Sequence, residues 1–523
     1  MSAELSGERA GGRPSALAGL RPLAVWAALA LALLAVGLWN LDGPAMWWDE
    51  GWTLSVARHW AEAGHYGRLR DGQLARPGLE AAATVTLPVG LTMRLLGVGI
   101  WQGRVFGVIC AVAVTLLLAA LAGRIFDRRA AAATVFAALL LTIHPQIHPL
   151  LQGRQVLAEM PMLMYLLAGY LCLWPALGGR PLAALPAALL LGLAWISKGQ
   201  TPPFLIASLA APAAAAALAR RWRTAALFGA TLAGAAAVAN LLGRVGYALL
   251  IDQTLPPDPS DGVLGMVAVV LTLFHRAYAL RSLLIFGLPA ALGLLWGLWA
   301  LWRERARAGE DDRGWYLRLT LLAFCGSWLA WFLVLSVGVP RYMATPAVVA
   351  SIFVAALLRD LTGGFAIGRR VGALAGLLTL RRPAREGWAA LLALALATVP
   401  LVITLMVLAI NYPEVDRSAE RVAAMLNAKP AGTRVETYES ELHFLLEQPY
   451  TYPPDQLHVA LGKRSLLVDE GAVVDYDPLA NAPAYLVVGR FARENGLYEP
   501  ALASGAFRLV LEDGLYEVYE RAP

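Results

Sequence analysis

The chain has 523 residues, of which 58% are hydrophobic and only 15% are charged, whereas soluble domains average about 45–50% apolar and about 25% charged residues. This composition excludes a disordered chain, a coiled coil and, despite a net charge of +6, a nucleic-acid-binding protein. Residues 1–410 contain 33 basic and 19 acidic residues, and residues 411–523 contain 10 basic and 18 acidic residues. We therefore predict an apolar, basic membrane body followed by a tail of ordinary soluble composition.

Apolar segments of about 20 residues, the length that crosses a bilayer, predict a polytopic α-helical membrane protein with about eleven transmembrane helices. The N-terminal flank 1–21 is arginine-rich and has no cleavage site after the first apolar segment, so that segment is predicted to be a retained span. The membrane domain is predicted over residues 22–410. Its predicted spans are 22–40, 101–123, 130–147, 159–175, 183–197, 200–219, 224–243, 281–302, 316–337, 342–359 and 388–410.

Arginine clusters decide the predicted orientation, because cytoplasmic loops carry an excess of Lys and Arg. If the tail 1–21 is cytoplasmic, all the strongly basic loops face the cytoplasm, and an odd number of spans places residues 411–523 outside. These basic loops are 124–129, 178–180, 220–223, 303–313 and 359–385. A crossing at the apolar segment 79–96 would spoil this pattern, so we interpret it as an interfacial helix on the outer membrane surface.

Three segments are predicted on the outer side of the membrane. They are the first loop, residues 41–100, a second long loop, residues 244–280, which contains the helix breaker Pro256-Pro257-Asp258-Pro259, and the tail 411–523. The tail combines strand-like runs, predicted helices at 416–427 and 440–447, and a terminal hairpin over 507–519. It is predicted to be a small extracytoplasmic α/β domain.

Acidic residues at two places are candidates for chemistry. Asp49 and Glu50 follow the first span directly, among three tryptophans. Their structural alternative is an N-cap and a first-turn acid of the following helix. Glu159 lies at the outer end of the predicted fourth span, where a carboxylate is costly and indicates a functional site. Its alternative is an anchor at the membrane interface.

Two cations on the outer side depart from the positive-inside pattern. Lys198 is one of only three lysines in the chain, and Arg341 lies at the outer end of another span. Each could bind a phosphate or be an interfacial residue whose charged end reaches water. Because acids and cations from distant parts of the sequence collect at one membrane face, we predict one cavity at headgroup depth. Such a cavity fits a substrate with a phosphate and a reacting group beside it.

Other common site motifs are missing from the sequence. No nucleotide-binding glycine motif and no serine-hydrolase motif occurs. His144 and His148 are four residues apart, but Pro145 and Pro149 interrupt the helix that would align them, so no metal site is predicted from them. His59 lies closer to the acid pair and is the histidine that we select as a substrate-binding candidate.

The order and spacing of these motifs resemble the lipid-linked glycosyltransferases of the C-type fold, in particular protein O-mannosyltransferases and lipid A aminoarabinose transferases. The resemblance covers about residues 22–360. Its matching motifs are Asp49-Glu50, Ala57-Arg58, Gly64-His65-Tyr66, Leu96-Gly97-Val98, Gly103-Arg104, Arg154 with Glu159-Met160-Pro161, Ser197-Lys198-Gly199, and Arg341-Tyr342 followed by Pro346.

The resemblance implies roles for individual residues. Asp49 is the implied general base, and Glu50 and Glu159 are further catalytic candidates. The implied contacts to the lipid phosphate are Lys198, Arg341, Arg58 and Arg76, the last in place of a lysine of the aminoarabinose branch. The remaining substrate-binding candidates are His59, Tyr66, Arg154 and Tyr342. The resemblance implies no obligatory cofactor. Glu159 would help to hold the acceptor, or a divalent metal, Mg²⁺ or Mn²⁺, in enzymes that use one.

The implied function is transfer of a hexosyl or pentosyl group from a polyprenyl-phosphate carrier to an extracytoplasmic glycan, lipid or protein. One carboxylate that deprotonates the acceptor hydroxyl opposite the departing phosphate would give inversion. The alternatives are a lipid or saccharide transporter or flippase, and a surface-polysaccharide polymerase or ligase, for which His275 and Arg276 are candidates. The branch resembled and the arginine- and alanine-rich composition imply a protein of the bacterial inner membrane and a role in the cell envelope.

Overall fold

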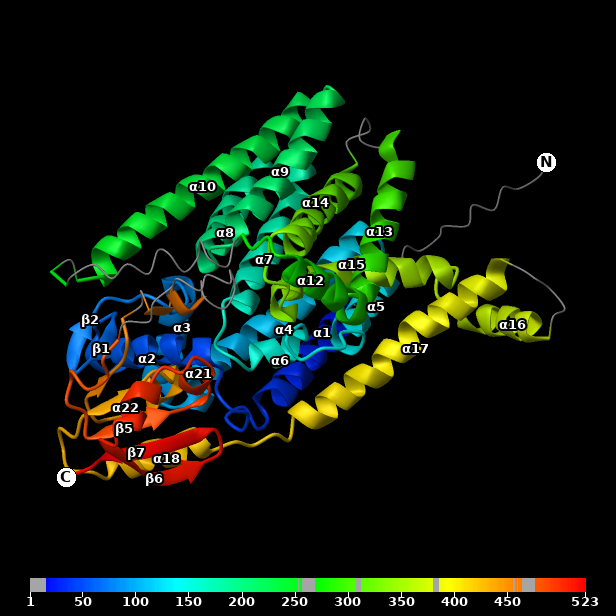
Figure 1. Ribbon diagram of the computed structural model, residues 1–523. Helices are drawn as coiled ribbons and strands as arrows, with labels where there is room; N and C mark the ends of the chain where they lie inside the picture. Colours follow the sequence, from blue (N-terminus) through cyan, green and yellow to red (C-terminus); the bar gives the residue numbers. More distant parts are fainter. Residues whose placement is uncertain are drawn as a thin grey trace, which may run out of the picture.

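The computed structural model describes residues 16–252, 254–255, 269–306, 312–379, 385–454, 457–458, 460–462 and 476–523. A body of helices occupies most of the molecule, and the C-terminal α/β domain lies at one end of it (Figure 1). Most of the predicted cytoplasmic tail, residues 1–15, lies outside the described residues. The same is true of the proline-rich part of the second long loop, residues 256–268.

Apolar helices correspond to all eleven predicted spans, so the chain is a multi-pass helical membrane protein. These helices are α1 (Ala16–Leu38), α4 (Ile100–Ile125), α5 (Arg128–Leu140), α7 (Glu159–Leu177), α8 (Ala184–Ser197), α9 (Thr201–Leu218), α10 (Trp222–Leu250), α13 (Leu288–Arg303), α14 (Arg313–Val334), α15 (Ala344–Leu361) and α17 (Arg385–Asn411). Short helices η1 (Pro181–Ala183) and α16 (Ile367–Leu378) lie between them.

The count of eleven complete spans is not confirmed. Seven described helices are long and apolar enough to cross a membrane, and the pair α12 (Leu273–Phe286) and α13 makes an eighth only if it is one span bent by 86°. The bend replaces the straight span predicted at 281–302, since Pro289 lies in the first turn of α13 and lacks the N–H that a continuous helix would need. Helix α5 ends at Leu140, because Pro145 disfavours helical geometry at His144.

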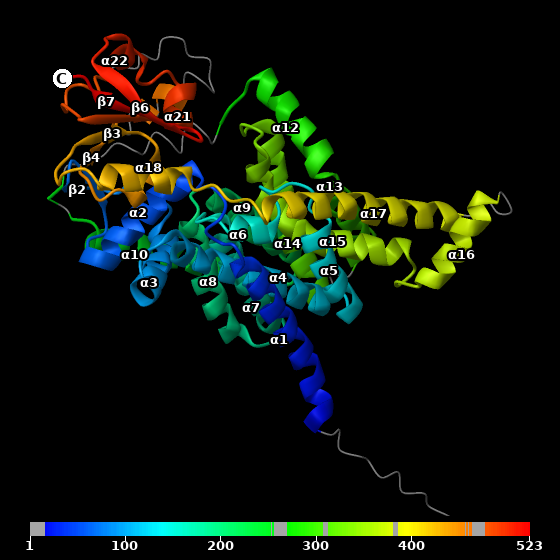
Figure 2. The ribbon, with the colours of Figure 1, turned by 90° about the horizontal axis from the view of Figure 1, so that it is seen from below.

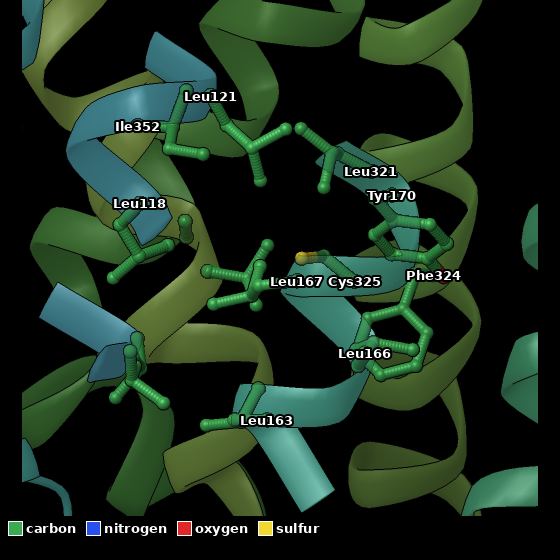
Figure 3. Close-up of a cluster of buried hydrophobic side chains, with 14 of the residues drawn as sticks. Leu118, Leu121, Leu163, Leu166, Leu167, Tyr170, Leu321, Phe324, Cys325 and Ile352 are labelled. Carbon is green, nitrogen blue, oxygen red and sulfur yellow. The ribbon is translucent and has the colours of Figure 1, made fainter. Parts of the chain in front are cut away.

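The centre of the body is a closely packed apolar core. Helices α4, α7, α14 and α15 each contribute side chains to it, among them Leu118, Leu167, Phe324 and Ile352 (Figure 3). The surrounding helices pack on this centre. Because protein interiors are as dense as organic crystals, such a core fixes the ends of its helices relative to one another.

The segment after α1 forms a helical arm with a small hairpin. It consists of α2 (Trp48–Ala63), β1 (Arg68–Arg70), β2 (Gln73–Ala75) and α3 (Ala83–Leu96). Asp71 and Gly72 both have positive φ, as the tight turn of the hairpin requires. Helix α3 covers most of the predicted interfacial segment 79–96. One of its faces is buried against α2, and Leu91 and Leu95 are exposed on another face, as expected for a helix at a membrane surface.

The C-terminal residues form the predicted small α/β domain. Its five-stranded sheet has the order β4 (Tyr450–Thr451), β3 (Val435–Thr437), β5 (Tyr485–Val488), β7 (Tyr516–Arg521) and β6 (Phe507–Asp513). Strands β4, β3 and β5 are parallel, and β7 and β6 form the antiparallel terminal hairpin. The helices are α18 (Ser418–Asn427), α19 (Ser440–Leu445), α21 (Arg490–Glu494) and α22 (Glu499–Ala503).

The C-terminal domain packs tightly on α2. Trp52 of α2 is buried within the apolar core of the domain, and the indole of Trp48 donates a hydrogen bond of 2.9 Å to the carbonyl of Tyr438. At Gly51 a Cβ atom would lie 2.3 Å from the backbone nitrogen of Glu441, so only glycine permits this approach. Figure 2 shows the C-terminal domain at the end of the molecule where α2 lies. The domain therefore rests directly on the helix that carries Asp49.

Candidate active site

Four charged residues from distant parts of the sequence meet in what we call the central charge cluster: Asp49, Glu159, Lys198 and Arg341. Arg341 forms ion pairs with both acids, through Nη1 with Asp49 and through Nε with Glu159 at 2.8 Å. Lys198 Nζ lies 2.9 Å from the same oxygen, Oε1 of Glu159. The structure thus brings together the two acids and two cations that the sequence analysis placed at one membrane face.

Exposure within the central charge cluster increases from Glu159 to Asp49. The side chain of Glu159 is 1% exposed, those of Lys198 and Arg341 are 12% and 16% exposed, and that of Asp49 is 44% exposed. Lys198 and Arg341 both contact one oxygen of the buried Glu159, and these contacts orient the two cations. Asp49 is therefore the acid of the cluster that a substrate can reach.

Local backbone structure places each member of the cluster. Asp49 lies in the first turn of α2, Glu159 is the first residue of α7, and Lys198 has extended backbone geometry that ends α8. Arg341 lies in the short 3-10 helix η3 (Pro340–Met343), where the indole of Trp328 donates a 2.8 Å hydrogen bond to the carbonyl of Tyr342. All four residues thus lie at or beside the ends of helices, and the site forms where these ends meet.

Glu50 points away from its neighbour Asp49 and is fully buried. Its Oε1 accepts from Arg104 Nε at 2.7 Å and from the backbone of Val156 at 3.1 Å, and its Oε2 accepts from Arg104 Nη2 at 2.8 Å and from Trp47 at 3.1 Å. Arg104 is also fully buried. This ion pair fixes the start of α2 to α4, and the bond to Trp47 is the capping-box interaction.

Arg104 was missed as a site-forming residue in the sequence analysis, where it appeared only as part of a matching motif. Its Nη1 also donates to the carbonyls of Leu41 and Pro44, at 2.9 and 3.0 Å. An arginine near the start of a long apolar helix needs a buried partner. That requirement is the signal that could have paired it with one of the two adjacent acids.

Four predicted substrate-binding residues make contacts outside the central charge cluster. Arg58 donates to the carbonyl of Phe444 at 2.7 Å and so holds the C-terminal domain, and Arg76 donates to the Tyr247 hydroxyl at 3.2 Å. His59 Nδ1 lies 3.3 Å from the Gly67 carbonyl, and burial lowers its pKa. Tyr66 is buried, which raises its pKa.

Arg154 and Tyr342 differ in their relation to the cluster. Tyr342 follows Arg341 directly, and its ring packs edge-on against Trp331 with centroids 5.8 Å apart. Arg154 is buried beside Tyr412, with its guanidinium 4.4 Å from the centre of that ring. Nε and Nη1 of Arg154 have no hydrogen-bond partner in the described structure.

Arg154 lines a cavity of about 490 Å³ between the helical body and the C-terminal domain, which we call the interdomain cavity. Residues 44–48 of the first loop and parts of the 145–155 segment form one side. Glu439, Glu441, Phe491 and Tyr516 of the C-terminal domain are on the other side.

The two acids of the C-terminal domain in this cavity are themselves buried. Burial, and for Glu439 the nearby charge of Glu441, raise the pKa values of both carboxyl groups. Glu439 Oε1 accepts from the backbone of Ala492 at 2.9 Å, and Glu441 Oε1 accepts from the Tyr516 hydroxyl at 2.5 Å. The folded domain therefore binds a proton at this pair more tightly than the unfolded chain does.

This proton linkage predicts a pH-dependent stability of the C-terminal domain. Where the folded state binds more protons than the unfolded state, the free energy of unfolding decreases as the pH rises. We expect the unfolding temperature of the purified protein to fall as the pH rises above about 5, and the fall to be smaller in Glu439→Gln. Glu447→Gln, which changes an exposed acid of the same domain, is the control and should follow the wild-type curve. Equal pH dependence in all three proteins would contradict the prediction.

The residues around Glu159 do not fit a divalent metal ion. Two cations already contact Oε1 of Glu159, and they would repel a further positive charge. Among the residues that the structure describes, no three His, Cys, Asp or Glu side chains are grouped so that they could hold a metal. The donor set is instead suited to a ligand that brings negative charge to Lys198 and Arg341.

Comparisons with known proteins agree with this architecture. Residues 85–247 match the family model described as dolichyl-phosphate-mannose-protein mannosyltransferase. No curated protein matches the chain. Among solved structures, the chain is similar to ArnT from Cupriavidus metallidurans bound to undecaprenyl phosphate, with a TM-score of 0.58 and 16% identity over 95% of this chain and 97% of that one.

A second similar structure is the oligosaccharyltransferase of Archaeoglobus fulgidus tethered with an acceptor peptide. Its TM-score is 0.54 and its identity 12%, over 95% of this chain and 74% of that one. Similarities over nearly the whole chain at such low identity establish a shared fold. The protein therefore has the C-type fold of the lipid-linked glycosyltransferases, and residues 85–247 match the sequence model of one of their families.

Proposed function

We propose that the protein is a membrane glycosyltransferase that moves a sugar, with inversion, from a polyprenyl-phosphate carrier to an acceptor outside the cytoplasm. The observation that carries this proposal is the central charge cluster. It joins an accessible carboxylate, Asp49, to two cations, Arg341 and Lys198, that a buried acid holds in place. The fold shared with ArnT, a protein solved with undecaprenyl phosphate, supports a lipid-phosphate ligand at these cations.

The proposed reaction needs one base and a stabilised leaving group. Asp49 accepts the proton of the acceptor hydroxyl while the oxygen of that hydroxyl bonds to the anomeric carbon of the sugar. The bond from the anomeric carbon to the phosphate oxygen breaks on the opposite face. The phosphate leaves with the bonding electrons, and Lys198 and Arg341 stabilise the negative charge that develops on it. A phosphate is a good leaving group without protonation, and the configuration at the anomeric carbon is inverted.

Buried acids have supporting roles in this proposal. Glu159 positions the two cations, because both contact its Oε1. Glu50 positions the start of α2, and hence Asp49, through Arg104. Arg58 holds the C-terminal domain on α2 through the carbonyls of Phe444 and Leu446. Among these acids, catalytic contact with the reacting atoms is then left to Asp49.

We propose that the central charge cluster and the C-terminal domain face the outside of a bacterial inner membrane. Helix α7 runs from Glu159 in the cluster to its other end, where the Arg313 guanidinium lies 4.9 Å from the ring of Trp174. The basic loops at 124–129 and 359–364 contact each other, through the 2.7 Å ion pair between Arg359 and Asp127. Basic loops thus gather away from the cluster, as cytoplasmic loops do.

The alternative functions explain the site less well. In transporters with inverted repeats, the substrate site lies near the bilayer midplane, whereas this cluster is built from helix ends. For a polymerase or ligase, His275 and Arg276 would need to be available to substrate. His275 instead bonds to the Thr272 hydroxyl at 2.5 Å, and Arg276 donates to the carbonyls of Leu333 and Ser336.

Lys198→Ala is expected to weaken the binding of undecaprenyl phosphate by about 10- to 100-fold, because a charge-assisted hydrogen bond contributes about 1.5–3 kcal/mol. The measurement is the dissociation constant of undecaprenyl phosphate with the purified full-length protein in nanodiscs. Lys429→Ala is the matched control, since Lys429 lies in the C-terminal domain with its ammonium 5.2 Å from the ring of Tyr485. Equal affinity in the Lys198 variant and the control would exclude a phosphate site at Lys198.

A further inference from the structure

Buried polar groups on both walls of the interdomain cavity have atoms without a hydrogen-bond partner in the described structure. Glu441 is 6% exposed and its Oε2 has no hydrogen-bond partner in the described structure, while its Oε1 accepts from Tyr516. On the opposite wall, Arg154 is 2% exposed and leaves Nε and Nη1 without partners. A buried polar atom without a hydrogen bond costs free energy. A ligand in the cavity would recover this cost on both walls.

Aromatic side chains line the same cavity. Trp47 is 38% exposed there, and Phe491 stacks on Trp48 with centroids 4.6 Å apart and an interplanar angle of 12°. The cavity volume of about 490 Å³ falls within the range of about 300–1,000 Å³ typical of small-ligand sites. The walls therefore combine flat apolar surface with a hydrogen-bond donor, Arg154, and a hydrogen-bond acceptor, Glu441.

The cavity adjoins the proposed base without using the proposed phosphate-binding cations. Trp47 and Trp48 precede Asp49 directly, and the lining residue Gln155 precedes Val156, whose backbone contacts Glu50. The members of the central charge cluster, Asp49, Glu159, Lys198 and Arg341, do not line it. A ligand that extends beyond the cavity past Trp48 would approach Asp49 from the side of the C-terminal domain, so the carrier and the second ligand would occupy different surfaces.

We propose that the interdomain cavity binds the acceptor and that this acceptor is a carbohydrate, recognised by Glu441, Arg154 and Trp47. The proposal rests on the proposed function, because it gives the second substrate of the transfer reaction a place. A carboxylate accepts hydrogen bonds from sugar hydroxyls, a guanidinium donates to hydroxyl or acidic oxygens, and an indole face packs on the C–H face of a sugar ring. A hydrocarbon chain would leave both charged groups unpaired.

The raised pKa values of Glu439 and Glu441 agree with this assignment. Burial raises both pKa values, and the nearby charge of Glu441 raises that of Glu439 further. Groups of two other elements act on Glu441. The charge of Glu50 in α2 raises its pKa, and the hydroxyl of Tyr516 in β7 donates a hydrogen bond to it. A ligand hydroxyl donated to Oε2 of Glu441 would stabilise the ionised form and replace the missing partner.

The test uses a strain that lacks the gene, complemented with the wild-type protein or a variant, and mass spectrometry of the cell-envelope glycans, glycolipids and proteins. Glu441→Gln keeps the shape and removes the charge, and Trp47→Ala changes a partly exposed ring outside the core. Both variants are expected to lower the sugar modification about tenfold or more. Glu447→Gln, an exposed acid of the same domain, is the control and should restore it fully.

A second measurement separates this proposal from the proposed function. The affinity of each purified variant for undecaprenyl phosphate should stay within about twofold of the wild-type value, which also shows that the protein is folded. If Glu441→Gln and Trp47→Ala both restore sugar modification to the wild-type level while Asp49→Asn is inactive, the acceptor-site proposal is overturned. The proposed function would then still stand. A modification found on a protein side chain would overturn the carbohydrate assignment. Full modification by Asp49→Asn would overturn the proposed function itself.

Discussion

Asp49→Asn is expected to lower sugar transfer by about 10²–10⁴-fold, the usual contribution of a general base. An asparagine keeps the size of the side chain and can still accept a hydrogen bond from Arg341, so the cluster geometry should persist. It cannot take the proton of the acceptor hydroxyl. Transfer should therefore be lost while the affinity for undecaprenyl phosphate changes little. The measurement is the sugar modification of the envelope in the complemented strain, beside carrier binding by the purified variant.

A matched control for Asp49→Asn lies in the same loop. Asp42 is 38% exposed and pairs with Arg417 at 2.8 Å, away from the central charge cluster. Asp42→Asn removes the same charge at similar exposure and should leave transfer nearly unchanged. Substantial transfer by Asp49→Asn would require another base. The other acids beside it are buried and paired, Glu50 with Arg104 and Glu159 with two cations.

The members of the central charge cluster could be predicted from the sequence because each departs from a rule of membrane topology. Lys198 and Arg341 are basic residues at outward-facing ends of spans, and Glu159 is an acid at the start of one. Their pairing could not be predicted. That Arg341 joins Asp49 to Glu159 depends on which helix ends become neighbours, and nothing in the spacing of 292 and 182 residues encodes this.

Adjacent residues in the sequence need not enter the same site. Asp49 and Glu50 were interpreted together as catalytic candidates, but successive helical residues point about 100° apart. The cluster therefore includes Asp49, and Glu50 turns inward to Arg104. The structural alternative weighed for Glu50, a first-turn acid of the helix, agrees with its capping-box contact to Trp47.

The fold itself was predicted best where the hydrophobic signal was long. Helix α4 is a largely apolar helix of 26 residues, and it begins and ends close to the prediction. The errors come from short signals: the proline that ends α5, the bend between α12 and α13, and the Asp71-Gly72 turn of the small hairpin. The interdomain cavity was beyond sequence reasoning, because residues of the first loop, the 145–155 segment and several parts of the C-terminal region form it.

Glu50→Gln is expected to cause the largest loss of stability of any single change near the site. Arg104 would remain fully buried with its countercharge removed, and breaking such a pair costs about 3–5 kcal/mol. The hydrogen bonds from Val156 and Trp47 also end at this carboxylate, so the start of α2 would lose several contacts together. The measurement is thermal unfolding of the purified variant. A lower yield of folded protein should accompany it.

The same variant decides whether Glu50 acts through structure or through chemistry. Asp42→Asn breaks an exposed ion pair, which contributes only about 0–1 kcal/mol, and serves again as the control. If Glu50 is a positioning residue, the Glu50→Gln protein that remains folded should bind undecaprenyl phosphate normally and lose transfer in proportion to its loss of stability. A variant as stable as the wild type but unable to transfer sugar would show instead that Glu50 takes part in the reaction. Its complete burial behind Trp47 and Arg104 favours the first outcome.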